Sequence, residues 1–445
     1  MQNYLIKNIS IVNEGRSFNS DLLIRNGRIE KIANHIASMS DVEEINGEAL
    51  HLLPGCIDDQ VHFREPGLTH KADIHSESRA AVAGGVTSFM EMPNTLPPVF
   101  TQELLEDKYD IASKTSLANY SFYMGTSNTN TEEVLKTNEK KKDVCGIKIF
   151  MGSSTGNLLV DNYLTLDKLF AGSELLIATH CENENIIRRN LQDFQSLNRE
   201  LTAADHPLIR SEEACYESSL AAIQFAKKYG SRLHVFHLST EREMQLFTNL
   251  IPQAEKRITA EVCVHHLHFT AGDYDRLGNL IKCNPAIKAA HNREALWKAL
   301  LDDRLDLIAT DHAPHTLEEK GWRRNSGGEL EKLSGKDGSY LQAHAGLPLV
   351  QHSLLLMLHY VKEGRISLEK VVEKMSHSVA VCFRIKERGF IREGYHADLV
   401  MVDLQGNSAI HAGKRREKGG GSPLEGMVFP ASIVNTFVNG HKVYG

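Results

Sequence analysis

The stretch PGCIDDQVHFREPG, from Pro54 to Gly67, has the form of a barrel strand that delivers metal ligands to an active site. Its central residues are Gln60-Val61-His62, where a paired His-x-His would be expected in a metal-binding strand. The stretch therefore raises the question of whether this chain keeps a working metal site with one altered ligand or has lost that site.

Similar short β-rich runs recur along the chain and alternate with helical patterns. Including CIDDQVHF there are eight, and the others are GVTSFMEMP, NYSFYMG, VCGIKIFMG, LLIATHCE, RLHVFHLS, RITAEVCVHH and LDLIATDHAPH. Eight alternations over about 260 residues favour a (β/α)8 TIM-like barrel over an open doubly wound sheet. No G-x-G-x-x-G turn follows any of these strands, which also argues against a nucleotide-binding sheet.

Both ends of the chain are β in character. The Asn26-Gly27 and Asn439-Gly440 pairs are typical of tight hairpin turns between strands. We therefore predict that the two termini together build a small β-sandwich domain. The expected division of the chain is 1–52 and 388–445 for that domain and 53–387 for the barrel.

Composition narrows the classes of protein that the chain can belong to. Its 445 residues are 41% hydrophobic and 24% charged, and no apolar run is long enough to span a bilayer, so we expect no membrane partner. The net charge of −7 gives no general attraction to nucleic acid. The N-terminus lacks a signal peptide and the seven cysteines form no C-x-x-C pair, which predicts a cytoplasmic protein without a disulfide framework or zinc knuckle.

Polar residues late in the predicted strands are the candidates for chemistry, because barrel active sites lie at the carboxyl ends of the strands. These candidates are Gln60, His62, Lys148, His180, His237 and Asp311. A single histidine at a strand end is more often structural than a ligand, but histidines and an aspartate converging at one barrel end suit Zn²⁺. We interpret His234, His265 and His268 as structural and leave His266 open.

Lys148 lies inside the apolar run CGIKIF and needs a physical reason to be there. A bare ammonium group is costly to bury, and burial lowers its pKa. The lysine therefore points to an unusual chemical state or partner.

The sequence resembles the cyclic amidohydrolases, and within them the dihydroorotases, across nearly the whole chain. The resemblance rests on motifs that occur in the expected order: HFREPG, HKAD, AAVAGGVTSFMEMPNT, GIKIFMGSSTGN, ATHCEN, HVFHLST, AEVCVHHLHFT and ATDHAPHTLEEK. It implies a zinc site in which Lys148 is carboxylated to a carbamate that bridges two metals.

Family roles can be carried onto the matching positions. His180 and His237 would bind one metal, and His62 and Asp311 the other. Gln60 is a departure from the family pattern, because a carboxamide oxygen is a weaker Zn²⁺ ligand than an imidazole, so it is a weak or absent ligand. We expect one tightly bound zinc and a second that is partly occupied.

The resemblance also implies a reaction and a substrate site. The reaction is the reversible cyclisation of N-carbamoyl-L-aspartate to L-dihydroorotate in pyrimidine biosynthesis, with Asp311 as the proton shuttle. The structural alternative is that Asp311 only caps the N-terminus of a helix. The substrate carboxylate needs a cationic fork, and the expected contacts are Arg64, Asn94, Asn284, His315 and the backbone of Ala345 and Gly346. Arg64 could instead only pair with Glu65 or Asp73, and Asn94 could only shape a turn.

Two other functions compete with this one. An allantoinase or hydantoinase would share the metal ligands but has little need of Arg64, because its substrate ring carries no carboxylate. A catalytically inactive scaffold protein is supported only by Gln60 and opposed by the retained Lys148.

The resemblance implies a homodimer. Residues 316–340 are predicted to be a mobile loop near the site, or a surface insertion without a role. His344 and Val379 depart from the family pattern near the site.

Overall fold

The computed structural model describes residues 2–140, 142–152 and 157–445. Part of the GIKIFMGSSTGN motif, residues 153–156, therefore lies outside the described chain. Eight parallel strands form the central sheet: β6 (Cys56–Val61), β7 (Val86–Glu91), β8 (Asn119–Gly125), β9 (Gly146–Phe150), β10 (Ile177–His180), β11 (Leu233–Val235), β12 (Ile258–Cys263) and β13 (Leu307–Ala309). Each of the eight predicted runs contains one of these strands, so the prediction of the barrel is confirmed.

The sheet closes into a barrel where β6 meets the chain that follows β13. Val61 and His312 form a parallel bridge, and the backbone N–H of His62 donates to the carbonyl of His312 at 2.7 Å. Apolar side chains, among them Met90, Tyr123 and Phe236, fill the interior. The barrel interior is thus a packed core rather than an open channel.

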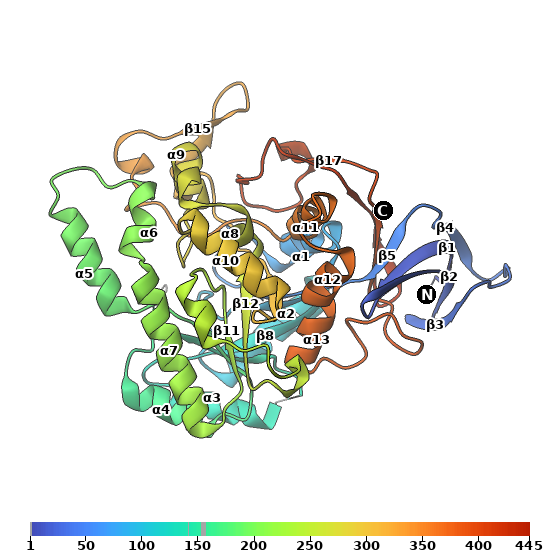
Figure 1. The fold of residues 1–445 in the computed structure, drawn as a ribbon, viewed down its shortest axis with the longest axis horizontal. Coiled ribbons are helices and arrows are strands. Elements are labelled where there is room, and N and C mark those ends of the chain that lie inside the picture. Colours follow the sequence, from blue (N-terminus) through green and yellow to red (C-terminus); the bar gives the residue numbers. More distant parts are fainter. Residues whose placement is uncertain (1, 141, 153–156) are drawn as a thin grey trace.

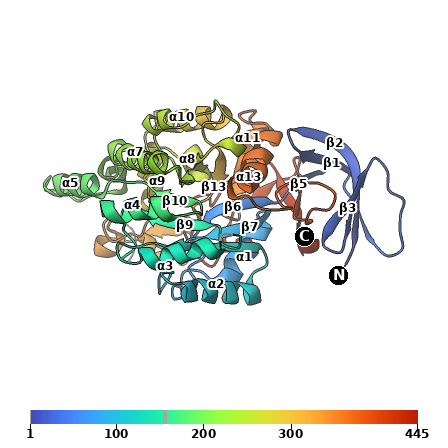
Figure 2. The same cartoon turned by 90° about the horizontal axis from the view of Figure 1, so that it is seen from below.

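Helices surround the barrel, as Figure 2 shows. They are α1 (Ile74–Ala83), α2 (Gln102–Thr115), α3 (Thr131–Leu135), α4 (Tyr163–Gly172), α5 (Glu184–Gln195), α6 (His206–Ile209), α7 (Glu212–Tyr229), α8 (Val264–His268), α9 (Tyr274–Leu277), α10 (Ala290–Leu301), α11 (Ser353–Lys362), α12 (Leu368–Val372) and α13 (Ser378–Phe383). Within the described residues, no helix is both long and apolar enough to cross a membrane.

The two chain ends form one eight-stranded sheet beside the barrel (Figure 1). Its strands are β1 (Tyr4–Asn13), β2 (Arg16–Arg25), β3 (Arg28–Ala33), β4 (Glu43–Asn46), β5 (His51–Pro54), β16 (Leu399–Asp403), β19 (Ser432–Val438) and β20 (His441–Tyr444). β16 pairs with β5, which joins the C-terminal strands to the N-terminal ones. Both predicted Asn-Gly turns connect neighbouring strands, with the left-handed backbone that a tight turn needs at Asn26 (φ 52°) and Asn439 (φ 50°).

Residues 316–340 contain regular structure, which the prediction of a mobile or functionless loop did not include. β14 (Trp322–Arg324) and β15 (Leu330–Lys332) form an antiparallel hairpin. Tyr340, at the end of this segment, contacts His206 through its hydroxyl at 2.7 Å, and Glu319 at its start contacts His315. A further pair of short strands, β17 (Ser408–Ala409) and β18 (Val428–Phe429), lies near the C-terminus.

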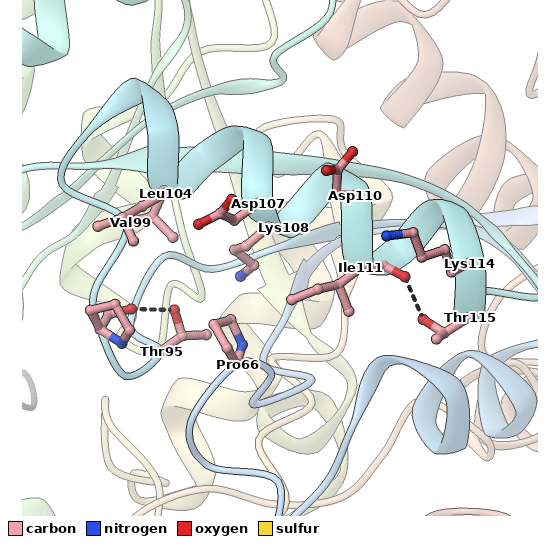
Figure 3. A pocket seen from close by; sticks show the side chains of 11 residues that line it. Pro66, Thr95, Val99, Leu104, Asp107, Lys108, Asp110, Ile111, Lys114 and Thr115 are labelled. Carbon is pink, nitrogen blue, oxygen red and sulfur yellow. Dashed lines mark hydrogen bonds between the residues drawn. The ribbon is translucent and has the colours of Figure 1, made fainter.

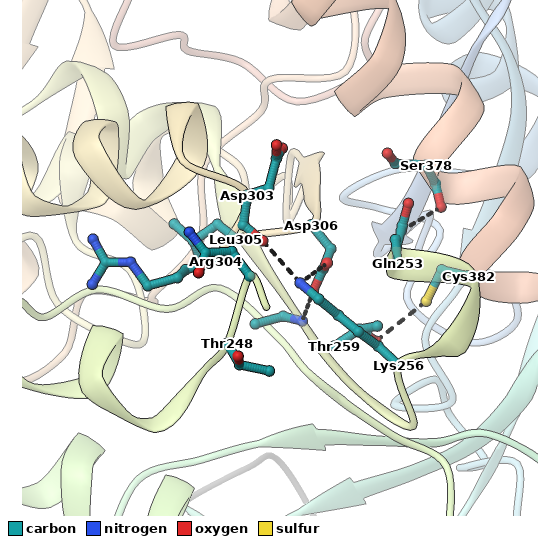
Figure 4. A network of polar contacts seen from close by, with 12 residues as sticks. Thr248, Gln253, Lys256, Thr259, Asp303, Arg304, Leu305, Asp306, Ser378 and Cys382 are labelled. Carbon is teal, nitrogen blue, oxygen red and sulfur yellow. Dashed lines mark hydrogen bonds and ion pairs between the residues drawn. The ribbon is translucent and has the colours of Figure 1, made fainter. Parts of the chain in front are cut away.

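A buried ion pair fixes the starts of β12 and β13 at the end of the barrel opposite the site (Figure 4). The ammonium of Lys256 lies 2.7 Å from Asp306 and 2.8 Å from the carbonyl of Asp303. The other carboxylate oxygen of Asp306 accepts the backbone N–H of Ala260 in β12. Asp306 therefore satisfies a buried cation and a strand amide together.

We predict that Asp306→Ala lowers the free energy of unfolding by about 3–5 kcal/mol, because it leaves the buried Lys256 charge unpaired. The measurement is denaturant unfolding followed by circular dichroism. Glu294→Ala is the control, because it removes the partner of Arg365 at an exposed ion pair and should have a much smaller effect. Equal losses in the two variants would contradict the assignment.

Candidate metal centre and active site

All of the predicted site residues line a single cavity of about 240 Å³ at the carboxyl ends of the barrel strands. They are Gln60, His62, Arg64, Asn94, Lys148, His180, His237, Asn284, Asp311, His315, Ala345 and Gly346. Phe150, Ala313 and His344 complete the wall. The strand order thus brings together side chains that are up to 286 positions apart in the sequence, Gln60 and Gly346 being the extremes.

His62 and Asp311 face each other across the closure of the barrel. The Nε2 atom of His62 lies 3.1 Å from a carboxylate oxygen of Asp311, and its Nδ1 atom lies 2.7 Å from the amide oxygen of Asn94. Because an amide oxygen only accepts, Nδ1 carries the proton and Nε2 presents its lone pair towards Asp311. Asp311 does not cap a helix, since the next helical turn begins at Glu318, so that alternative is wrong.

His180 and His237 form a second pair in the same cavity. Their Nδ1 and Nε2 atoms lie 3.0 Å apart. The other nitrogen of His180 lies 2.9 Å from Glu182, whose carboxylate also pairs with Arg210. Burial lowers the pKa of both histidines, which keeps the two rings neutral.

Lys148 lies within electrostatic reach of both pairs. Its side chain is 1% exposed, and its ammonium lies 3.9 Å from the ring centre of Phe236. Burial lowers the pKa of Lys148 to about 7, although Asp311 and Glu261 oppose the shift. The amine is therefore far more readily deprotonated than an exposed lysine, which makes it available as a nucleophile near neutral pH.

Three cavity residues have left-handed backbone conformations that non-glycine residues rarely adopt: Arg64 (φ 73°), His237 (φ 39°) and Asp311 (φ 48°). Buried carboxylates stabilise two of them, since Glu91 accepts the N–H of Arg64 at 3.1 Å and Glu261 accepts that of His237 at 3.2 Å. Such strain is typical of functional sites.

Glu91 is itself held by Lys108, a buried lysine of α2, at 2.6 Å. Figure 3 shows Lys108 on this helix. The same ammonium donates to the carbonyl of Met92 at 3.1 Å. The loop that carries Arg64 is therefore fixed from behind by a buried ion pair.

The guanidinium of Arg64 lies in the cavity wall and does not pair with Glu65 or Asp73. It donates to the carbonyl of Pro314 at 3.2 Å and contacts His315 at 3.0 Å. Burial lowers the pKa of Arg64 to about 10, so it remains a cation at neutral pH. His315 also contacts Lys71 and Glu319, and burial lowers the pKa of His315 well below its usual value. The cavity thus has a cationic wall around a neutral imidazole.

The remaining predicted residues complete the cavity in different ways. The amide oxygen of Asn284 lies 3.2 Å from His206. The carbonyl of Ala345 faces His315 at 3.1 Å, and the N–H of Gly346 already donates to Lys282. The amide oxygen of Gln60 is directed at the thiol of Cys263, 3.6 Å away. Gln60 therefore makes no contact with His62 that would substitute for a second imidazole.

This arrangement fits a Zn²⁺ site. The Nε2 atom of His62 faces a carboxylate oxygen of Asp311 at 3.1 Å, and the Nδ1 atom of His180 faces the Nε2 atom of His237 at 3.0 Å. These atoms are of the types that Zn²⁺ binds, and each pair is close enough to share one cation. The Nδ1 atom of His237 is buried without a hydrogen-bond partner. A carboxylate orients His180 from behind, as is usual for zinc-bound histidines.

The residues that hold the predicted ligands in place were not predicted from the sequence. Glu182 lies two positions after His180 in ATHCEN, so that spacing could have identified it. Glu91 is the last residue of β7, so it could have been found as a polar residue late in a predicted strand. Arg210 and Lys108 had no such signal, because Lys108 lies in α2 and Arg210 directly follows α6. Glu261 gave no separate signal, because it lies inside the β-rich run RITAEVCVHH.

The chain matches the amidohydrolase family over residues 51–443, and it belongs to that family. Within the family, its relatives place it among the hydrolases that act on cyclic amides.

A dihydroorotase of Methanosarcina acetivorans is 32% identical over 96% of this chain and 89% of its own. A dihydroorotase of Carboxydothermus hydrogenoformans is 33% identical over 99% and 97% of the two chains. Among solved structures, the L-hydantoinase of Arthrobacter aurescens is similar with a TM-score of 0.89, 25% identity and coverage of 99% of this chain and 96% of that one.

We predict that Glu182→Gln weakens zinc binding about 10- to 100-fold, because it removes the carboxylate that orients His180. It should also lower the thermal unfolding temperature, since Arg210 is left as a buried unpaired charge. Zinc competition with a chelator and a thermal scan measure the two effects. Glu213→Gln, which removes the partner of Arg189 at an exposed pair, should change neither. Wild-type zinc affinity in Glu182→Gln would refute the orienting role.

Proposed function

We propose that this protein is a zinc-dependent dihydroorotase, which interconverts N-carbamoyl-L-aspartate and L-dihydroorotate in pyrimidine biosynthesis. The observation that carries the proposal is one cavity that is lined by a buried lysine, the His62–Asp311 and His180–His237 pairs and a buried arginine. The lysine and histidines suit metal-assisted hydrolysis of an amide, and the arginine suits a substrate carboxylate. The named activity of relatives at 32% and 33% identity supports the same assignment.

Zinc would be held by His180, His237 and Lys148 on one side and by His62, Asp311 and Lys148 on the other. Bound Zn²⁺ supplies a water of lowered pKa, about 7, and polarises the carbonyl that is attacked. The first side keeps all of its ligands. The second lacks an imidazole at position 60, and the Gln60 oxygen is engaged with Cys263. One tightly bound zinc and one partly occupied site follow from this difference.

Lys148 would act as a carbamate. Its neutral amine adds to CO₂, a C–N bond forms and one proton is released to water. The product replaces a cation that burial disfavours with an anionic oxygen ligand, which explains why a lysine occupies this interior position. A purely binding protein has no physical need for such a lysine between histidines, and this weighs against the scaffold alternative.

The chain's own residues then divide the remaining work. Asp311 takes the proton from the attacking water and returns it to the leaving ring nitrogen, a role that suits a carboxylate in the cavity wall. Arg64 binds the substrate carboxylate, with Asn94, Asn284 and His315 as further hydrogen-bonding groups. Asn94 also fixes the tautomer of His62, because its oxygen accepts from Nδ1.

A hydantoinase or allantoinase is the alternative enzyme, and the structural similarity to the L-hydantoinase of Arthrobacter aurescens supports it. Arg64 separates the two functions. A buried guanidinium in the cavity favours a substrate with a free carboxylate, which dihydroorotate has and a simple hydantoin lacks.

We predict that Arg64→Ala lowers kcat/KM for dihydroorotate by about 100-fold or more, mainly through KM, because a charged double hydrogen bond is lost. Arg64→Lys should recover only part of the loss, since it keeps the charge but not the fork. Ring opening of dihydroorotate is followed by ultraviolet absorbance, with hydantoin as the comparison substrate and zinc content as the control. Near-wild-type kinetics in Arg64→Ala, or faster turnover of hydantoin by the wild type, would reject the carboxylate role.

We also predict that dialysis against a weak chelator leaves close to one zinc per chain, and that added zinc restores a second. Elemental analysis of wild type and Gln60→His measures this, and Gln60→His should retain more of the second metal because it adds a nitrogen ligand. If the wild type still holds two zincs per chain after dialysis against the chelator, the expectation is wrong.

A further inference from the structure

A group of side chains of the types that bind metals lies outside the cavity lining, at the end of β12. Cys263 is the last residue of that strand, and His265 and His266 follow it in α8. All three are buried. Their sulfur and nitrogen atoms lie within 4.8 Å of one another. One ion with ligand bonds of about 2.0–2.3 Å can span donors up to about 4.5 Å apart, so the three side chains are close to that arrangement.

The two histidines have nitrogen atoms without adequate partners. Neither nitrogen of His265 has a well-formed hydrogen bond, and the backbone of Thr310 offers it only a weak contact. The Nε2 atom of His266 donates to the carbonyl of Pro285 at 3.1 Å, which leaves its Nδ1 lone pair buried and unpaired. Buried polar atoms are normally satisfied, so these three nitrogens need an explanation.

A carbonyl that holds one nitrogen of a histidine while the other stays free is the arrangement found behind metal-bound histidines. The rings are also neutral, because burial lowers the pKa of His266 to about 4 and that of His265 well below its usual value. Both histidines are therefore ready to act as ligands without losing a proton.

Gln60 connects this group to the cavity. Its side chain lines the cavity, and its amide oxygen accepts the thiol proton of Cys263 at 3.6 Å. The carboxylates Glu261, Asp311 and Asp58 lie within electrostatic reach of the thiol. They would stabilise a cation placed there, so the surroundings of Cys263 favour positive charge.

We propose that Cys263, His265 and His266 form a separate binding site for a Zn²⁺-class ion, with the Gln60 amide oxygen or a water as fourth ligand. One thiolate and two imidazoles are a donor set that Zn²⁺ and Co²⁺ prefer. Binding releases the thiol proton to solvent and forms the metal–sulfur bond, without any redox step. The site differs in chemistry from the proposed catalytic ligands, which include no sulfur.

Cobalt titration of the metal-free full-length protein tests this proposal. A thiolate bound to Co²⁺ gives a near-ultraviolet charge-transfer band that nitrogen and oxygen ligands do not give. We expect the band in the wild type and its complete loss in Cys263→Ser. Lys148→Met should keep the band, since it removes a ligand of the other site only. His266→Gln should weaken Co²⁺ binding, measured by titration of this band, about 10-fold or more, because it removes one of three protein donors.

Cys215→Ser is the matched control, because Cys215 is a buried cysteine of α7 with a single weak contact to Ser239. It should leave the band unchanged. Far-ultraviolet circular dichroism checks the fold of each variant, and Cys263→Ala replaces Cys263→Ser if the latter does not fold. Absence of the band in the wild type, or its persistence in the Cys263 variant, would overturn the proposal. Neither result depends on turnover of dihydroorotate, so the proposed function is tested separately.

Discussion

The site depends on the hydrogen bonds that close the barrel around His312. Its carbonyl accepts the N–H of His62 at 2.7 Å, and its backbone bridges both Val61 and Leu347. The buried imidazole is fixed as well, since its Nε2 atom donates to Glu77 at 2.8 Å and its Nδ1 atom accepts the N–H of Leu349 at 2.9 Å. This one residue therefore joins three segments that are far apart in the sequence.

The consequence of that closure is the His62–Asp311 pair. His62 follows the strand on one side of the seam and Asp311 precedes His312 on the other, so the closing hydrogen bond sets their separation. The left-handed backbone of Asp311 costs free energy, of the order of 1–3 kcal/mol, as do those of Arg64 and His237. Buried carboxylates offset part of this cost at Arg64 and His237. The rest of this cost is offset by the stability of the whole barrel, which holds these backbone conformations in place.

The sequence was sufficient to predict the barrel and the positions of the cavity residues. Strand ends meet at one face of a parallel barrel, so any polar residue late in a strand, such as Lys148 or His180, could be placed without coordinates. What could not be predicted was which ion pairs form behind the cavity residues and hold them in place. The Glu182–Arg210 and Glu91–Lys108 pairs join a strand end to a helix, and that choice depends on packing rather than on local pattern. The hairpin at 322–332 was missed because its strands are only three residues long.

Gln60 is better understood from its contact than from the residue it replaces. In the proposed zinc enzyme, a three-donor set of His62, Asp311 and a Lys148 carbamate would still match the ligand number of many catalytic zinc sites, so binding of a second zinc would be weakened rather than excluded. Among the described residues, the donor to the Gln60 amide oxygen is the Cys263 thiol, which is a weak donor. If Cys263 becomes a thiolate on binding its own metal, that contact is lost and the amide is free to turn towards either ion. Gln60 would then couple the occupancy of the two sites, since its one oxygen can serve only one of them at a time.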